Sequence, residues 1–280
     1  MRRNWIGILL LIFLFAITAT LTANIPTADF YENFYKAART ALAGHSPYET
    51  IYNSAPWGLV PLFPFALFPP VPAHGLYFAA CLFLLAYMAW KLRASPLTIV
   101  AFMLSPTALG AVLVGNLDPV AAAGMLFPPA FGLLLLLIKP QVGAGVALYY
   151  LIDFIRNKRY LDGVKAFAPV AAAYALALVF FPIWYVRIFT NTSAYQVWNR
   201  TLFPYSIPIG LFLLWAALRK RNPYFALAAT PFLAPYHTFY TYAIVQIGLL
   251  HSDVEQVVRR DVLHILLSIF LWIIMLVFKL

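Results

Sequence analysis

The stretch WIGILLLIFLFAITATLTAN, residues 5–24, carries no charged side chain. It is long enough to cross a bilayer, because a spanning helix needs about 20 apolar residues. Arg2 and Arg3 in front of it and the small residues behind it would also suit a cleaved signal peptide. Since further apolar runs follow along the chain, we expect residues 5–24 to be a retained first span.

The composition of the whole chain points the same way. Hydrophobic residues make up 64% of its 280 positions and charged residues 10%, whereas soluble domains carry roughly 45–50% and 25%. The net charge of +10 comes mainly from short basic clusters between apolar runs, which is typical of cytoplasmic loops in membrane proteins. We therefore expect an all-α polytopic integral membrane protein of the cell membrane, a single transmembrane domain over residues 1–280 that contacts membrane lipids and binds no nucleic acid.

The basic clusters also predict a topology. If all of them face the cytoplasm, an even number of passes must separate neighbouring clusters, which predicts about nine to eleven spans and a cytoplasmic N-terminus. Several of these spans are short and broken by proline. The candidate runs are 5–23, 74–91, 97–114, 118–127, 130–138, 141–155, 165–183, 205–218, two pieces on either side of Pro235, and 262–278.

Residues 24–72 are predicted to form the first extracytoplasmic loop. Within it, DFYENFYKAARTALAG, residues 29–44, has the apolar spacing of a juxtamembrane helix that ends at Gly44. The proline-rich segment APWGLVPLFPFALFPPVP, residues 55–72, is expected to lie at the interface as broken helix. The loop thus predicts an outer layer of short helices after the first span.

This threading places polar residues from four separate loops on the extracytoplasmic side. Ionisable groups at the membrane edge are costly to bury and therefore mark candidate functional sites. We predict one site there, formed by Asp29, Glu32, Tyr35, Asn116, Asp118, Lys139 and His237.

Each of these residues also has a structural interpretation. Asp29 and Glu32 have capping-box spacing, although Asp29 could equally accept a proton from a substrate hydroxyl, with Glu32 and Tyr35 as substrate contacts. Asn116 and Asp118 lie in the turn sequence GNLDP, where Asp118 could begin a helix or contact a substrate hydroxyl or a metal.

Lys139 and His237 are the cationic candidates. Lys139 could extend to the lipid headgroups or bind a lipid-linked phosphate. His237 could be a structural hydrogen-bonding group, a phosphate ligand or a proton shuttle. The histidines show no metal-ligand spacing, and no nucleotide-binding motif occurs, so we expect neither a metal nor a cofactor.

Several of these segments together resemble glycosyltransferase family 87, the bacterial polyprenyl-phosphate-mannose-dependent mannosyltransferases with the GT-C membrane fold. They are DFYENFYKAARTALAGHSPY, the proline-rich aromatic segment, DPVAAAG, LLLLLIKPQVGAGVALYYLIDFIRNKR and APYHTFYTYA. The residues that match the family pattern are Asp29, Phe34, Tyr35, Ala37, Ala38, Gly44, Pro47, Tyr48, Lys139, Pro140, Pro235 and His237.

The resemblance implies a GT-C-like helical bundle and an inverting hexosyltransferase. Its donor would be a polyprenyl-phosphate sugar, with mannose as the expected sugar, and its acceptor an extracytoplasmic lipid or glycan. Asp29 would be the catalytic base, and Lys139 and His237 would bind the donor phosphate. Two other classes stay open: a transporter, since broken helices and polar groups are also typical of transporters, and a non-catalytic membrane scaffold subunit.

Overall fold

The computed structural model describes residues 28–182, 184–186, 196–250 and 257–278, and every regular element in these ranges is helical. The all-α prediction is thus confirmed for this part of the chain, while the predicted first span lies outside it.

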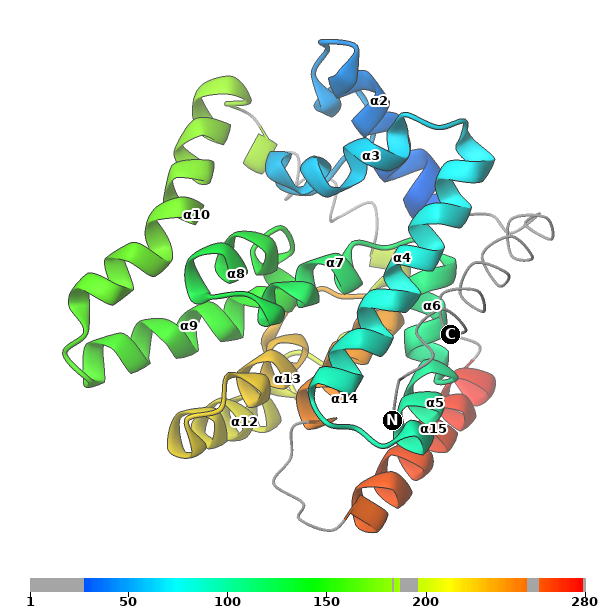
Figure 1. Ribbon diagram of the computed structural model, residues 1–280, viewed down its shortest axis with the longest axis vertical. Helices are drawn as coiled ribbons and strands as arrows, with labels where there is room; N and C mark the ends of the chain where they lie inside the picture. Colours follow the sequence, from blue (N-terminus) through cyan, green and yellow to red (C-terminus); the bar gives the residue numbers. More distant parts are fainter. Residues whose placement is uncertain (1–27, 183, 187–195, 251–256, 279–280) are drawn as a thin grey trace, which may run out of the picture.

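The short helices before the first long one are η1 (Ala28–Tyr35), α2 (Lys36–Leu42), η2 (Pro47–Glu49), η3 (Pro56–Leu62) and α3 (Phe63–Ala66). The remaining elements are α4 (Pro70–Lys91), α5 (Pro96–Met103), α6 (Pro106–Leu113), α7 (Asp118–Ala122), η4 (Ala123–Leu126), α8 (Pro129–Leu136), α9 (Pro140–Arg156), α10 (Tyr160–Phe180), η5 (Gln196–Trp198), α12 (Ile207–Lys220), α13 (Pro223–Leu233), η6 (Phe239–Thr241), α14 (Tyr242–Leu250) and α15 (Val257–Phe278) (Figure 1).

Prolines divide the chain into these elements. A proline fits the first position of a helix, where its missing N–H has no partner to lose and its φ is already helical. The α-helices that begin at a proline are α4, α5, α6, α8, α9 and α13. Ser95, Ser105 and Asn222 cap three of them by accepting hydrogen bonds from backbone N–H groups.

Three helices of the described chain are long and apolar enough to cross a membrane. They are α4, α10 and the 261–278 part of α15, which coincide with predicted spans. The predicted span 97–114 is instead the pair α5 and α6, bent by 60° at a short break, and would be a fourth span if the pair crosses as one unit. Length and composition therefore indicate three or four spans here, and the larger total stays a prediction.

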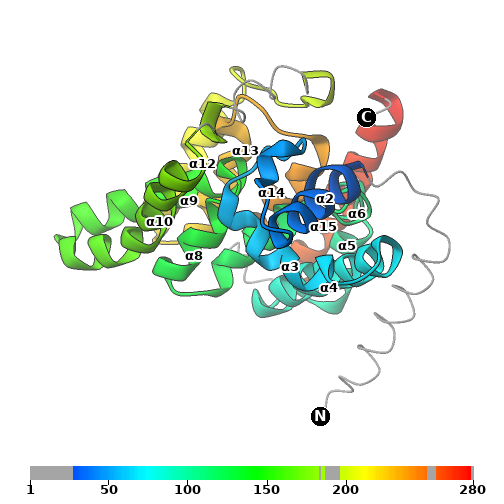
Figure 2. The same ribbon diagram turned by 90° about the horizontal axis from the view of Figure 1, so that it is seen from above.

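The short helices from η1 to α3 form an outer layer over one end of the helical body. Both views place α2 and α3 there, beside the N-terminal part of α4 (Figures 1 and 2). The body itself is built on α13, which packs between α9 and α14 and also contacts α12. On the other side of the molecule α15 packs along α5 and α6.

Small residues let these central helices approach closely, as is common for helices packed in membranes. A Cβ atom on Gly145 of α9 would lie 2.6 Å from the carbonyl oxygen of Ala226 in α13. One on Gly248 of α14 would lie 2.5 Å from the carbonyl oxygen of Tyr224. The backbones of α9, α13 and α14 are therefore in near contact.

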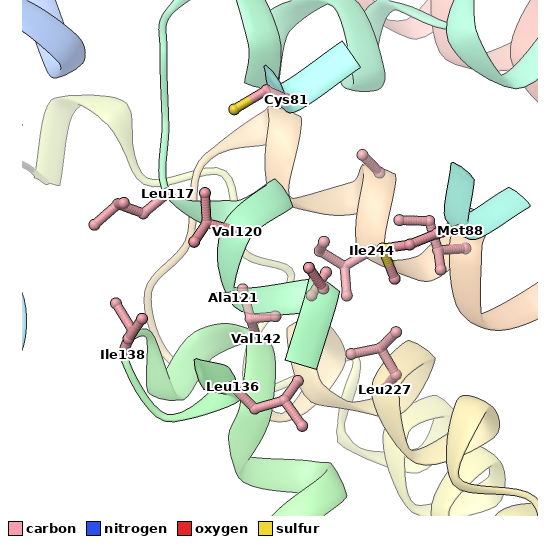
Figure 3. Packing of buried hydrophobic residues seen from close by; sticks show 14 of the residues in the cluster. Cys81, Met88, Leu117, Val120, Ala121, Leu136, Ile138, Val142, Leu227 and Ile244 are labelled. Carbon is pink, nitrogen blue, oxygen red and sulfur yellow. The ribbon is translucent and has the colours of Figure 1, made fainter. Parts of the chain in front are cut away.

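A buried apolar cluster holds the ends of the short helices in place (Figure 3). Leu117 and Ile138 are almost fully buried in it, together with Val120, Val142 and Ile244. Leu117 lies between Asn116 and Asp118, and Ile138 precedes Lys139. The apolar core thus fixes the backbone on which three of the predicted site residues are carried.

Candidate functional site

Asp29 lies in the first turn of η1, which continues into α2 and ends before Gly44 in a left-handed conformation with φ 83°. Its carboxylate Oδ2 accepts hydrogen bonds from Asn116 Nδ2 at 2.7 Å and from the Tyr240 hydroxyl at 2.6 Å. Both bonds come from residues far away in the sequence. Asp29 is therefore engaged in tertiary contacts and not in the capping box that its spacing with Glu32 permits.

Asn116 is the centre of the site. Its Nδ2 donates to Asp29 and, at 2.9 Å, to the Tyr240 hydroxyl, while its Oδ1 accepts from Lys139 Nζ at 2.7 Å. The same Oδ1 also accepts from the backbone N–H of Asp118 at 3.0 Å. With 3% of its surface exposed, Asn116 satisfies its buried amide entirely inside this cluster.

Asp118 and Lys139 form a buried ion pair. The Asp118 side chain is fully buried, and its Oδ2 also accepts a hydrogen bond from the Thr241 hydroxyl at 2.7 Å. The Lys139 side chain is 15% exposed, at the position that precedes Pro140 and α9. Buried charges are tolerated when they are paired in this way.

These contacts form a continuous set that we call the polar network: Asp29, Asn116, Asp118, Lys139, Tyr240 and Thr241. The network joins four segments of the chain, around residues 29, 116–118, 139 and 240–241. It holds two carboxylates and one ammonium group, so its formal charge is negative. The structure brings four of the predicted site residues, Asp29, Asn116, Asp118 and Lys139, into contact, and the site itself and the chemical roles of these residues stay predictions.

His237 lies beside the polar network without a hydrogen bond to it. The residue is 2% exposed, and its Nδ1 is 3.0 Å from the carbonyl oxygen of Thr238. Its Nε2 is buried without a hydrogen-bond partner among the described residues. Burial lowers the pKa of His237, partly offset by that carbonyl contact and by the charge of Asp118, so the ring favours its neutral form.

The structure places Glu32 and Tyr35 outside the polar network. Glu32 is exposed and forms an ion pair with Lys36, one turn further along the helix. The buried Tyr35 donates its hydroxyl to the carbonyl oxygen of Phe68 at 2.8 Å, which joins the outer helices to each other. Their predicted substrate contacts are untested by this arrangement.

Tyr240 and Thr241 were missing from the sequence prediction although both bind carboxylates of the network. Tyr77, on α4, was missing too; its hydroxyl donates to the backbone carbonyl of Asn116 at 2.8 Å. One signal was available in the sequence. Tyr240 and Thr241 follow His237 by only a few residues, next to the break at Pro235.

Gly115 sets the distance between Asp29 and Asn116. Its φ is 71°, and an added Cβ would lie 2.5 Å from Phe30 Cβ, while the Phe30 N–H donates to the Val114 carbonyl at 3.1 Å. Gly44 also has a positive φ, but a Cβ there would meet nothing within 4 Å. The two glycines therefore share a left-handed conformation that would strain any residue with a Cβ, and they differ in the space beside them.

We expect Gly115→Ala to destabilise the protein more than Gly44→Ala. The shared left-handed conformation costs about 1–2 kcal/mol for a residue with a Cβ, and only Gly115→Ala adds an overlap with Phe30. Thermal unfolding of both variants in the same detergent measures the difference. Equal melting temperatures would show that η1 does not rest on this turn.

In the part of the chain that the structure describes, the polar network contains two carboxylates and no histidine or cysteine. Among the described residues, no three His, Cys, Asp or Glu side chains are arranged to hold a metal ion. Two surface cavities lie elsewhere, one of about 470 Å³ beside Trp90 and Arg93 and one of about 310 Å³ lined by residues such as Tyr150 and Lys165. The side chains of the polar network bind each other.

Comparisons of the chain with protein-family models, with curated proteins and with solved structures give no match. The functional argument therefore depends on the residues and their geometry.

Proposed function

We propose that this protein is a membrane glycosyltransferase that moves a hexose, with mannose as the expected sugar, from a polyprenyl-phosphate donor to an extracytoplasmic lipid or glycan acceptor. The observation that carries the proposal is the hydrogen bonding of the Asp29 carboxylate. Asn116 and Tyr240 both bind its Oδ2, and no hydrogen bond from a described residue occupies Oδ1. A carboxylate that is oriented through one oxygen and available through the other suits a general base.

The proposed reaction follows from that orientation. Asp29 Oδ1 takes the proton from the acceptor hydroxyl as the acceptor oxygen attacks the anomeric carbon of the donor sugar. The bond between this carbon and the phosphate oxygen breaks on the opposite face, and the electron pair leaves with the phosphate. The sugar configuration is thereby inverted. Lys139 stabilises the departing charge, and His237, whose Nδ1 faces the Thr238 carbonyl, does so through Nε2 once its ring is protonated.

The membrane setting fits such a donor. Helices α4, α10 and α15 are apolar enough to lie among lipid tails, where the polyprenyl chain would be held. With the basic clusters in the cytoplasm, the N-terminus would be cytoplasmic and the polar network extracytoplasmic. The lipid phosphate would supply the activation, so the reaction needs no nucleotide.

The test is transfer of radiolabelled mannose from polyprenyl-phosphate-mannose by the purified full chain. We expect labelled lipid or glycan product with inverted anomeric configuration. Retention of configuration would contradict direct attack by the acceptor. Absence of product with mannosyl and glucosyl donors alike would contradict the proposed class.

A transporter is the second candidate, and the buried Asp118–Lys139 pair favours it. Paired ionisable groups beside broken helices also mark ion and proton pathways in membranes. Solute or proton flux into proteoliposomes that depends on Lys139 would support transport. Sugar transfer without such flux would support the enzyme. A scaffold subunit would show neither activity and would tolerate asparagine at position 29.

We expect Tyr240→Phe to lower the turnover of the transfer reaction by about tenfold. The variant loses the hydrogen bond of about 1.5 kcal/mol that the hydroxyl donates to the charged Asp29 carboxylate, and it also removes the acceptor of one Asn116 N–H. The phenylalanine ring keeps the volume of the side chain and removes only the hydroxyl that holds Asp29 Oδ2. Initial rates at saturating donor measure this effect. Tyr242→Phe is the matched control, because the contact of the Tyr242 hydroxyl among the described residues is a long one, 3.4 Å to the Arg200 carbonyl. An equal loss in both variants would contradict the role of Tyr240.

A further inference from the structure

The Asp118 carboxylate pairs with the Lys139 ammonium group, the same group that the proposed function assigns to the donor phosphate. Lys139 Nζ has three protons to donate, and it contacts both Asp118 and, at 2.7 Å, Asn116 Oδ1. Only 15% of the Lys139 side chain is exposed. A phosphate at Lys139 therefore has one remaining proton to accept, and it competes with the nearby Asp118 carboxylate for the single positive charge of the ammonium group.

We propose that Asp118 is an affinity-setting residue: it holds Lys139 in the empty site and releases it to the phosphate of a polyprenyl lipid. This inference rests on the proposed function, because it takes Lys139 to be the phosphate-binding group. In the empty site the carboxylate provides the negative partner that the buried ammonium requires. In the occupied site the phosphate provides it.

Asp118 keeps a partner when Lys139 leaves. The Thr241 hydroxyl donates to Asp118 Oδ2 at 2.7 Å, on the oxygen other than the one that contacts Lys139. This bond shares the carboxylate charge and weakens its hold on the ammonium. The Thr241 hydroxyl and the Lys139 ammonium group therefore bind different oxygens of Asp118 and compete for the charge of the carboxylate.

The experiment measures binding of farnesyl phosphate to the full chain in detergent, with farnesol and inorganic phosphate as separate probes. We expect Asp118→Asn to bind farnesyl phosphate about tenfold more tightly than wild type, which corresponds to about 1.4 kcal/mol. Without ligand this variant should melt at a lower temperature, because it leaves a buried ammonium unpaired, and saturating farnesyl phosphate should restore most of the loss. Lys139→Gln, alone or with Asp118→Asn, should bind farnesyl phosphate more weakly than wild type does.

Thr241→Val provides a second test with the carboxylate left intact. Removal of the hydroxyl concentrates the Asp118 charge on Lys139, so farnesyl phosphate should bind more weakly than to wild type. Thr241→Ser retains the hydroxyl and should bind as wild type does. The test therefore stands even if Asp118→Asn does not fold.

The possible failures are distinct. If binding to wild type depends on Lys139 but Asp118→Asn does not bind more tightly, or Thr241→Val does not bind more weakly, competition by Asp118 is wrong and the phosphate role of Lys139 survives. If no variant shows binding that depends on Lys139, the inference and the phosphate part of the proposed function both fail. Equal affinity for inorganic phosphate and farnesyl phosphate would overturn the assignment to a lipid-linked phosphate.

Discussion

Asp29→Asn is expected to reduce the rate of sugar transfer by about 10²–10⁴-fold, the contribution typical of a positioned general base. Asparagine has the shape of aspartate, and its amide oxygen can still accept hydrogen bonds from Asn116 and Tyr240. It cannot take a proton from the acceptor hydroxyl. The loss should therefore fall on kcat, with little change in donor KM, in initial-rate measurements on folded protein.

Asp162→Asn is the matched control for that measurement. It makes the same chemical change in an exposed pair with Arg159 at 2.8 Å, and an exposed ion pair contributes little to stability. Its transfer rate should equal that of wild type. Equal rates for Asp29→Asn and wild type would instead restrict Asp29 to a structural role.

Lys139→Met is expected to lower the free energy of unfolding by about 3–5 kcal/mol, because it leaves the fully buried Asp118 carboxylate without its ion-pair partner. Methionine retains most of the length of the lysine side chain, so the loss reports charge more than volume. Unfolding by a titrated denaturing detergent, compared with wild type, measures it.

The double variant Lys139→Met with Asp118→Asn distinguishes the pair from the individual residues. Replacement of both charges of a buried pair is often close to neutral, so the double variant should be more stable than Lys139→Met alone. Additive losses in the double-mutant cycle would show that Asp118 and Lys139 do not interact in the folded protein.

Four distant segments could be assigned to one site from the sequence, because a predicted topology places each loop on one of two sides of the membrane. Once the basic clusters are assigned to the cytoplasm, each polar residue between them has a side, and the bilayer brings residues on one side to one level. Asp29, Asn116, Asp118 and Lys139 were grouped in this way, and the structure brings their side chains into contact. Topology predicts no hydrogen-bond partner, so it could not show that Asn116 joins the other three.

Tyr240 and Thr241 were missed for a related reason. Tyrosine and threonine are common residues, and the two hydroxyls are significant only because of the carboxylates that they contact. The bend between α5 and α6 was missed although the sequence carries its signal. Ser105 followed by Pro106 is a typical helix start, and it lies in the middle of the apolar run 97–114.

The proposed role of the polar network is tested most directly by photolabelling of the full chain with a polyprenyl-phosphate-mannose analogue that carries a photoreactive group on the sugar. The account predicts that label appears on peptides containing Asp29, Asn116, Lys139 or His237, and that unlabelled donor competes for it. Label confined to the lipid-facing residues of α10 and α15, without competition by donor, would contradict the account.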